Sequence, residues 1–302
     1  MFSYNSLAEI AEAAERLGAS LSDVALADQA AAIGIPEGEV MARMRENLEV
    51  MRRSAREGLR PGLRSVSGLS GGDGLRISAY AAGGRAIGGP FGAKASALAI
   101  GIQEYNAAMG KIVAAPTAGS CGILPAGVIT MMEERGASED AATRALIAAG
   151  AVGMVIATVA TVSGAEGGCQ AECGSAAAMT AAALAELSGG SPSQAAHAAA
   201  IALQNLLGLA CDPVAGLVEI PCILRNGCGI AVAISAADMA LADVKSAIPV
   251  DEVIRAMGEV GRALPASLRE TAQGGLAATP TGMAMRERLF GGRGNSGGAP
   301  GG

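Results

Sequence analysis

Apolar residues recur at helical spacing along most of the 302-residue chain. Near the N-terminus, the apolar positions between Leu7 and Leu17 share one face of a helix, and Gly18 is a suitable residue to end it. The stretch 40–56 alternates apolar and charged residues, as a solvent-facing helix does. The alternation typical of strands is sparse, and the short stretch 111–115 is the best strand candidate. The pattern therefore predicts a predominantly helical protein.

Residues that cap helices precede several of the apolar stretches. Ser191 is followed by Pro192 at the first helical position and by Gln194 three residues on, which together form a capping box. Ser138 precedes two acidic residues suited to a first helical turn. Ser22 is the candidate cap of the second N-terminal helix. These signals predict separate helices joined by loops.

Composition indicates how such helices pack. The chain is 51% hydrophobic but only 2% aromatic, with 44 Gly and no Trp. A core of small and aliphatic side chains, with backbones close together at Gly and Ala, favours helix packed on helix over a β-sandwich. We therefore expect an all-α fold, a helical bundle with converging Gly-rich loops. We expect a helical N-terminal lead-in (1–60), a main domain (61–290) and a flexible Gly-rich tail (291–302).

One stretch is long enough to span a membrane. Residues 145–165 carry no charge over 21 positions. They are mostly Ala, Gly and Val, they are closed by Arg144 and Glu166, and the chain has no Trp for an interfacial belt. We interpret the stretch as a buried central helix. A small-molecule transporter built from Ala/Gly-rich helices is the alternative.

Charge and the N-terminal residues exclude other classes. The net charge is −6 and no basic stripe is present, which argues against a nucleic-acid partner. The first residues are acidic and amphipathic, without the basic and apolar regions of a secretory signal. We therefore expect a cytoplasmic protein with neither a membrane nor a nucleic-acid partner. In that reducing compartment the six Cys would be buried, metal-bound or reactive rather than disulfide-bonded.

The cysteines are the most informative residues of the chain. Five of the six lie between positions 169 and 228, and loop-forming residues such as Gly, Pro and Asp border them. Core cysteines normally sit inside helices, whereas cysteines at loop breaks can direct several thiolates at one centre, as in iron–sulfur clusters. The spacing matches neither ferredoxin runs nor paired zinc motifs. From spacing alone, a soft-metal site and scattered structural cysteines both remain open.

Other polar residues offer weaker candidates. The Gly-rich segment 67–74 and the loop 115–122 could each hold a phosphate or carboxylate through backbone N–H groups, or could serve only as turns. Glu104 and Asn106 are polar residues in an apolar setting and are candidates for a pocket. His197 is the only histidine, which excludes a His-rich zinc centre and leaves a Ser–His–Asp triad unsupported.

Seven segments from Ser67 to Phe290 carry a set of longer motifs. They are SGLSGGD (67–73), YNAAMG (105–110), APTAGSCG (115–122), SGAEGGCQAECGSA (163–176), LGLACDPVAGLVEIPCILRN (207–226), ADMALA (237–242) and LRETAQGGLAATPTG (268–282). With these motifs in this order, the sequence resembles the α chain of the iron–sulfur-dependent L-serine dehydratases (L-serine ammonia-lyases). The resemblance covers most of the chain and is far more specific than a single Gly-rich loop.

The resemblance implies a cofactor and a reaction. In the family three cysteines hold a 4Fe–4S cluster, and the matching residues here are Cys169, Cys211 and Cys222. The fourth iron lacks a protein thiolate and is open to substrate, so it can act as a Lewis acid toward the departing hydroxyl. The implied reaction dehydrates and deaminates L-serine to pyruvate and ammonia. The main domain, 61–290, would then be the iron–sulfur catalytic domain on which the Gly-rich loops converge.

The resemblance also implies substrate contacts and a partner. Thr117 and Ser120 are expected to contact the substrate carboxylate, with the loop that begins at Ser67 nearby. Family members are either fused proteins or α/β pairs, and this chain resembles only the α part. We therefore expect a separately encoded β subunit. The general base is not assigned to any residue of this chain, and the partner is one source for it.

Several alternatives stay open at this point. A related iron–sulfur lyase could act on L-threonine or L-cysteine instead of L-serine. Lys94 and Lys111 are formally available to a pyridoxal phosphate cofactor, although neither lies in a recognisable cofactor context. The roles of Cys121, Cys173 and Cys228 are not assigned.

Overall fold

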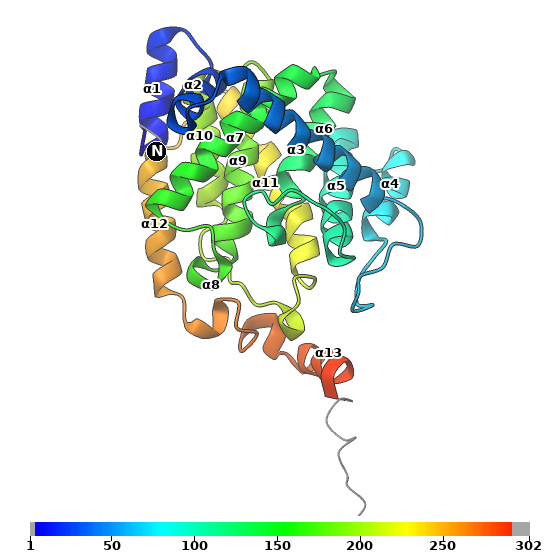
Figure 1. Cartoon of the computed structure of the whole chain (residues 1–302). Helices are drawn as coiled ribbons and strands as arrows, with labels where there is room; N and C mark the ends of the chain where they lie inside the picture. The colour runs from blue at the N-terminus through cyan, green and yellow to red at the C-terminus, as the bar shows by residue number, and fades with distance from the viewer. Residues whose placement is uncertain (1–3, 292–302) are drawn as a thin grey trace, which may run out of the picture.

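The computed structural model describes residues 4–291, which form a helical bundle (Figure 1). Within that range there is no β-strand, and the only bridge is an isolated one between Cys211 and Arg269. The all-α prediction is therefore confirmed. The α-helices are α1 (Leu7–Leu17), α2 (Leu21–Ile33), α3 (Glu37–Gly58), α4 (Asp73–Ala82), α5 (Gly89–Ala107), α6 (Ile123–Arg135), α7 (Glu139–Val159), α8 (Gly164–Gly167), α9 (Ser175–Leu187), α10 (Pro192–Gln204), α11 (Cys222–Leu241), α12 (Val250–Ala263) and α13 (Pro280–Phe290).

Short helical turns connect several of these helices. A π-helical turn, η2 (Gln170–Gly174), leads directly into α9. The 3₁₀ turns are η1 (Ala118–Ser120), η3 (Val214–Gly216), η4 (Ala266–Leu268) and η5 (Gly275–Ala278). The predicted Gly-rich tail, 291–302, lies outside the described residues except for Gly291.

Helix α9 is the centre of the bundle. Every residue from Ser175 to Ala185 is buried, and the helix packs against α6, α7, α10 and α11. Most of these residues are Ala, whose small side chains let neighbouring helices approach closely. A similar close approach occurs where α3 crosses α5. There Gly58 and Gly101 face each other with no room for a Cβ atom.

The first three helices pack into the same core. Leu7, Leu21 and Leu48 are fully buried there, together with the residues of α9. Helix α1 packs on α10, α2 packs on α7, and α3 packs on α5 and α7. The stretch predicted as an N-terminal lead-in thus contributes to the hydrophobic core of the rest of the chain.

The predicted helix ends agree with the structure in most places. The capping box at Ser191 is confirmed, and Gly18 ends α1 with a φ of 63°. The assignment of Ser22 as the cap of the second helix is wrong, because Ser20 caps α2. The Ser20 side chain accepts from the Asp23 N–H, and the Asp23 carboxylate accepts from the Ser20 N–H, while Ser22 is buried inside the first turn.

The strand suggested for residues 111–115 is also wrong. This segment is extended, but it is not part of a strand; it connects α5 to η1. Its apolar residues Ile112 and Val113 pack against the edge of the core, which explains the short apolar run. An apolar run of this length does not by itself distinguish a strand from an extended loop.

Among residues 4–291, two helices are long and apolar enough to cross a membrane by length and composition. They are α7, with a mean hydropathy of 1.7 in its most apolar stretch, and α11, with 1.2. In the fold, 67% of that stretch of α7 is buried, and α7 packs between α2, α3 and α9. The uncharged run interpreted as a central helix is helical as far as Val159 and then forms the loop that leads into α8.

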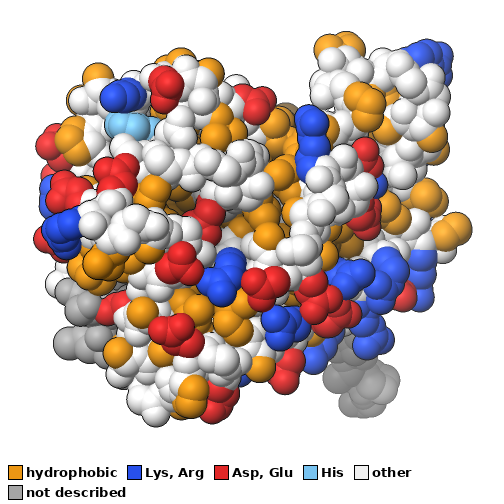
Figure 2. All heavy atoms as spheres, turned by 90° about the horizontal axis from the view of Figure 1, so that it is seen from above, with side chains coloured by type: hydrophobic (Ala, Val, Ile, Leu, Met, Phe, Trp, Pro, Cys, Tyr) orange, Lys and Arg blue, Asp and Glu red, His pale blue; other side chains and the backbone are white. Residues whose placement is uncertain are grey.

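Charges of both signs intermingle on the face shown in Figure 2. Some charged residues of the fold form ion pairs between helices, such as Arg45 of α3 with Glu139 of α7, at 3.3 Å, and Arg144 of α7 with Asp23 of α2, at 2.7 Å. Exposed pairs of this kind contribute little stability, about 0–1 kcal/mol each. The charged residues on the face shown in Figure 2 do not form one continuous basic patch.

Candidate active site

The three cysteines predicted to bind a cluster come from three separate segments of the chain. Cys169 immediately precedes η2, and Cys211 lies in the loop between α10 and η3. Cys222 is the first residue of α11. All three are buried, with exposed fractions of 2%, 3% and 6% respectively. Each of the three thus lies in a loop, or at or next to the start of a helix or turn, rather than in the middle of a helix, where core cysteines normally sit.

These three thiols, which we call the thiol cluster, lie close enough to interact electrostatically. Burial raises the pKa of Cys222 to about 12, and the neighbouring Cys169 adds to the shift. Burial also raises the pKa of Cys211. Cys169 differs: its hydrogen bond with the Cys173 sulfur, 3.4 Å away, and then the positive charge of Arg225 lower its pKa. Two of the three thiols are therefore disfavoured as free thiolates.

Gln170 joins the loop of Cys169 to the loop of Cys211. Its fully buried side chain donates from Nε2 to the carbonyls of Gly167, at 2.9 Å, and Met257, at 3.1 Å. Its Oε1 accepts from the Gly208 N–H at 2.8 Å. The Gln170 amide thus holds two loops and α12 together through its hydrogen bonds. This role explains why a glutamine directly follows Cys169.

Asp212 and Arg225 fix the other side of the thiol cluster. The Arg225 guanidinium donates to Asp212 Oδ1 and to the Ala210 carbonyl, each at 2.8 Å. Asp212 Oδ2 accepts from the Leu276 N–H at 2.7 Å. The residues on both sides of Cys211 are therefore anchored, and a positive charge is held beside the thiols.

Asn226 ties the first turn of α11 to the loop 115–122. Its Nδ2 donates to the carbonyls of Gly119, at 2.8 Å, and Cys222, at 2.9 Å. Its Oδ1 accepts from the Gly122 N–H at 2.9 Å, and the side chain is fully buried. The loop with the predicted substrate contacts is therefore held against the helix that begins with a cluster cysteine.

Glu172 links that loop to the thiol cluster, and sequence reasoning missed it. Thr117 Oγ1 donates to Glu172 Oε1 at 2.7 Å, and Cys211 Sγ lies 3.6 Å from Oε2. Burial raises the pKa of Glu172. Ser120 Oγ is 3.2 Å from Thr117 Oγ1, and Ser120 is fully buried beneath the turn. The Glu172 carboxylate thus joins Thr117 to Cys211, and Ser120 contacts Thr117 from beneath.

A signal for Glu172 was present in the sequence. It is the only charged residue between Gly167 and Ala185, a stretch of small and apolar residues. A carboxylate buried in such a stretch needs hydrogen-bond partners. Two glycines leave room for it: a Cβ on Gly164 would collide with the Glu172 carboxylate, and a Cβ on Gly119 would lie 3.0 Å from Oε1.

Ser67 lies beside this group without a hydrogen bond to it. Its Oγ is 3.2 Å from Ser65 Oγ and accepts from the Leu69 N–H at 3.0 Å, so its hydrogen bonds are within its own loop. The side chain borders a groove of about 620 Å³ that also reaches Ala118, the neighbour of Thr117. The structure therefore places Ser67 on the same side of the molecule as Thr117, at a groove rather than against the thiols.

Other residues considered from the sequence have structural partners elsewhere. Glu104 is buried and accepts from the Asp73 N–H at 2.7 Å, so it caps the start of α4. Asn106 donates to the Ala118 carbonyl at 3.1 Å. His197 borders a different cavity, between α1 and α10. Lys94 is engaged in ion pairs with two glutamates of α6.

The remaining cysteines differ in their surroundings. Cys121 is buried and donates to Gln103 Oε1 at 3.0 Å, and burial raises its pKa to about 12. Cys173 is buried against Cys169, whereas Cys228 is exposed on α11. Cys173 is thus the one cysteine outside the predicted ligand set that contacts it.

The donor set fits an iron–sulfur cluster. Soft thiolates are the usual ligands of such clusters, and Arg225 offsets part of their negative charge. Within residues 4–291 no three His, Cys, Asp or Glu side chains are gathered tightly enough to bind a single metal ion. A cubane distributes its ligands over different irons, so its thiolates lie farther apart than the ligands of one ion.

Comparisons with known proteins agree with this arrangement. Residues 8–277 match the family model described as serine dehydratase alpha chain. The probable L-serine dehydratase, alpha chain, of Bacillus subtilis (strain 168) is 46% identical over 289 residues, 96% of each chain. The L-serine dehydratase, alpha chain, of Peptoniphilus asaccharolyticus is 44% identical over 282 residues, 93% of this chain and 97% of that protein.

A longer relative is also similar. The L-serine dehydratase of Mycobacterium bovis is 39% identical over 292 residues, which are 91% of this chain but only 61% of that protein. The similarity to each of these relatives, long or short, extends over nearly all of this chain and is therefore not confined to single motifs. This chain belongs to the serine dehydratase alpha chain family.

Proposed function

We propose that this chain is the α subunit of a cytoplasmic iron–sulfur L-serine dehydratase that converts L-serine to pyruvate and ammonia. Membership of the family supports the reaction class and the substrate. The observation that supports the cofactor is that the buried thiols of Cys169, Cys211 and Cys222, from separate segments, lie within electrostatic reach of one another and of the fixed guanidinium of Arg225.

Cys169, Cys211 and Cys222 would hold a 4Fe–4S cluster. When bound, a cluster with one iron free of protein thiolate supplies a Lewis acid for the departing hydroxyl group. Arg225 would offset the charge of the thiolates, and Asp212 keeps its guanidinium in place. Because burial raises the pKa of Cys211 and Cys222, cluster binding would displace their protons.

The turn that begins at Thr117 is the proposed substrate-binding element. The Thr117 hydroxyl proton is donated to Glu172, so the oxygen of Thr117 can accept a hydrogen bond from the substrate ammonium. The backbone N–H groups of the turn are candidate donors to the substrate carboxylate. Ser120 contributes by supporting Thr117 from below, and the loop of Ser67 borders the adjoining groove.

The general base is not assigned within this chain, and we propose that a β subunit completes the site. The M. bovis relative has more than a third of its length outside the region shared with this chain. The alpha-chain names of the B. subtilis and P. asaccharolyticus proteins indicate that this region is encoded separately in those organisms. Here a separate β chain would supply the region that the longer relative carries in the same chain.

The test is anaerobic co-expression of this chain with its β subunit. Iron and sulfide per α chain and the rate of pyruvate formation from L-serine are measured for the wild type, for Cys211→Ser and for Cys228→Ser. Cys228 is exposed and outside the ligand set, so Cys228→Ser is the matched control and should retain both properties. Cys211→Ser should lose most of its iron and its activity. A Cys211→Ser enzyme with wild-type iron and turnover would refute the ligand assignment.

The same preparation tests the substrate. L-serine, L-threonine and L-cysteine are compared by kcat/KM under identical anaerobic conditions. We expect L-serine to be preferred, in agreement with the names of the relatives. A higher kcat/KM for L-threonine or L-cysteine would replace the substrate assignment without affecting the cluster ligands.

A further inference from the structure

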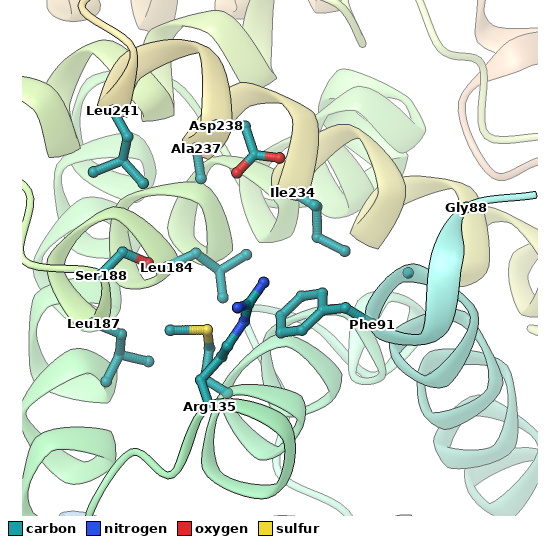
Figure 3. A pocket seen from close by; sticks show the side chains of 12 residues that line it. Gly88, Phe91, Arg135, Leu184, Leu187, Ser188, Ile234, Ala237, Asp238 and Leu241 are labelled. Carbon is teal, nitrogen blue, oxygen red and sulfur yellow. The ribbon is translucent and has the colours of Figure 1, made fainter.

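A cavity of about 500 Å³ lies at the opposite end of the helices that carry the site (Figure 3). Helix α11 begins with Cys222 and ends at the cavity with Ile234, Asp238 and Leu241 among its lining residues. Its 20 residues correspond to about 30 Å at 1.5 Å per residue. Helix α9 follows η2 and Cys173 at one end and lines the cavity with Leu184 at the other.

Two opposite charges face each other across this cavity. Figure 3 shows the Arg135 guanidinium entering from the end of α6 and the Asp238 carboxylate entering from α11 on the other side. Phe91, Leu184 and Ile234 form apolar walls between them. The Arg135 guanidinium lies 5.8 Å from the centroid of the Phe91 ring. Both residues are exposed, and neither charged side chain forms an ion pair with another residue of the described part of the chain.

Helix stability does not account for Asp238. It lies in the last turn of α11, where the negative end of the helix dipole disfavours a carboxylate. It belongs to the segment ADMALA, which the proposed reaction does not use. Arg135 is the last residue of α6, where a cation is favoured, but its guanidinium points into the cavity rather than along the helix (Figure 3).

We propose that this cavity binds a free α-amino acid with an apolar side chain. Arg135 would pair with the carboxylate, Asp238 would pair with the ammonium group, and Phe91, Leu184 and Ile234 would surround the side chain. A simple anion would be repelled by Asp238 and a simple cation would be repelled by Arg135. A zwitterion is therefore the class of ligand that can pair with both charged side chains. The volume lies in the usual range for small-ligand pockets, about 300–1,000 Å³.

The position of the cavity also predicts an effect on the site. Helix α6 begins just after the loop 115–122 and ends with Arg135, while α11 runs from Cys222 to Asp238. A ligand that bridges Arg135 and Asp238 would hold these two helices together at one end and so bias their arrangement at the other. We therefore expect the occupied cavity to change the KM for L-serine. This second part rests on the proposed function, whereas the binding itself does not.

Binding is tested by isothermal titration calorimetry on the anaerobic α–β complex. The probes are L-leucine, L-methionine and L-phenylalanine, and, as blocked controls, N-acetyl-L-leucine and L-leucinamide. At least one free amino acid should bind, and each blocked form of leucine should bind at least about tenfold more weakly, because each loses one charge-assisted contact. Failure of all three amino acids to bind at millimolar concentration, or equal binding of the blocked forms, would overturn the proposal.

Variants then locate the binding site. Arg135→Gln and Asp238→Asn should each weaken binding at least about tenfold. Glu259→Gln, an exposed change on α12, is the matched control and should bind as the wild type does. Wild-type binding by both Arg135→Gln and Asp238→Asn would place the ligand elsewhere and overturn the proposal, and so would equal weakening by Glu259→Gln.

The coupling is read from the KM for L-serine with and without a saturating amino acid. A shift in the wild type that is lost in Asp238→Asn supports the coupling, and an unchanged KM with proven binding refutes the coupling alone. If the complex forms no pyruvate at all, the proposed function fails, but the calorimetric result is unaffected. The two proposals are therefore distinguished by different measurements.

Discussion

At the scale of single residues, the site is organised by the polar neighbours of the cysteines. Gln170 follows Cys169, Asp212 follows Cys211, and Asn226 lies one helical turn after Cys222. Each of these side chains makes two or three buried or part-buried hydrogen bonds, at least one of them to a segment more than 35 residues away in the sequence. The motif residues beside the predicted ligands thus act by fixing loops, and a change at any of them leaves buried partners unpaired.

A change at Gly164 tests how tightly these loops are packed. In Gly164→Ala the new Cβ would collide with the Glu172 carboxylate and lie 3.1 Å from Cys211 Sγ. We expect a loss of about 1–3 kcal/mol of stability from overpacking, together with reduced iron per chain. Urea unfolding and iron analysis measure the two effects.

The matched control is Gly150→Ala. Gly150 is exposed on α7, and a Cβ there meets nothing within 4 Å. This change should raise stability by about 0.5–1 kcal/mol, because Ala is a better helix former than Gly. Wild-type stability and iron content in Gly164→Ala would show that the loops of the site tolerate an added methyl group.

Sequence reasoning at this scale identified cysteines but not their partners. Cys169, Cys211 and Cys222 stand out because each is bordered by a loop-forming residue and a recognisable motif. Glu172 does not stand out in this way, since its contacts with Thr117 and Cys211 join residues 55 and 39 positions apart. Such contacts depend on how the loops meet, which local patterns do not encode.

At the scale of elements, two long-range carboxylates fasten the N-terminal helices to the bundle. Asp251 of α12 accepts from Ser6 Oγ at 2.7 Å and from the N–H groups of Leu7, at 2.8 Å, and Ala8, at 3.1 Å. Glu186 of α9 accepts from the Ser22 N–H at 3.1 Å. The first turns of α1 and α2 are therefore capped from outside as well as by their own serines.

Removal of the Asp251 carboxylate should loosen α1. In Asp251→Ala the first turn of α1 loses three acceptor contacts, at a cost of about 1–3 kcal/mol. Hydrogen exchange should become faster in α1 (Leu7–Leu17) than in α9. Glu252→Ala, the exposed neighbour, should leave both measurements unchanged. Equal exchange of α1 in Asp251→Ala and the wild type would contradict the tethering role.

Glu186 should make stability depend on pH. Burial raises the pKa of Glu186 above its usual value of 4.5, so the folded state prefers the protonated form. Its contribution to the free energy of unfolding is therefore full at pH values below the unfolded-state pKa and falls as the pH rises through the folded-state pKa. Glu186→Gln keeps an acceptor for Ser22 and removes the charge, so it should be more stable than the wild type at neutral pH.

The comparison is made by urea unfolding across a pH series. The stability difference between Glu186→Gln and the wild type should shrink toward acid pH, where the wild-type carboxyl is protonated as well. A Glu186→Gln variant that is destabilised by the same amount at every pH would show that the hydrogen bond with Ser22, rather than the buried charge, governs this position.

Element boundaries were predictable where local capping decides them. Ser191 and Gly18 act through neighbouring residues only, and both predictions are confirmed. Residue type could not show which of Ser20 and Ser22 caps α2, because both are serines. The cap is Ser20, because Asp23 lies three residues after it and completes the capping box. The segment 111–115 was misassigned because its apolar side chains pack on helices, not on a neighbouring strand.

At the scale of the whole molecule, helix α9 connects the candidate site to the cavity proposed to bind an amino acid. Its N-terminal end continues from η2 and the thiol cluster, and its C-terminal end lines the cavity with Arg135 and Asp238. The small-residue composition predicted helix-on-helix packing, since Ala and Gly allow such close contact. It did not predict which loops meet, because contacts such as that between Gln170 and Gly208 form only in the folded chain.

The central claim is that three cysteines from separate segments of the chain hold one cluster. The most direct measurement is the crystal structure of the anaerobic α–β complex, with anomalous scattering recorded at the iron absorption edge. We predict a single four-iron cluster bound by the sulfurs of Cys169, Cys211 and Cys222, with one iron lacking a thiolate from this chain. Iron bound elsewhere in the complex, or a cluster that excludes any of these three sulfurs, would contradict the account.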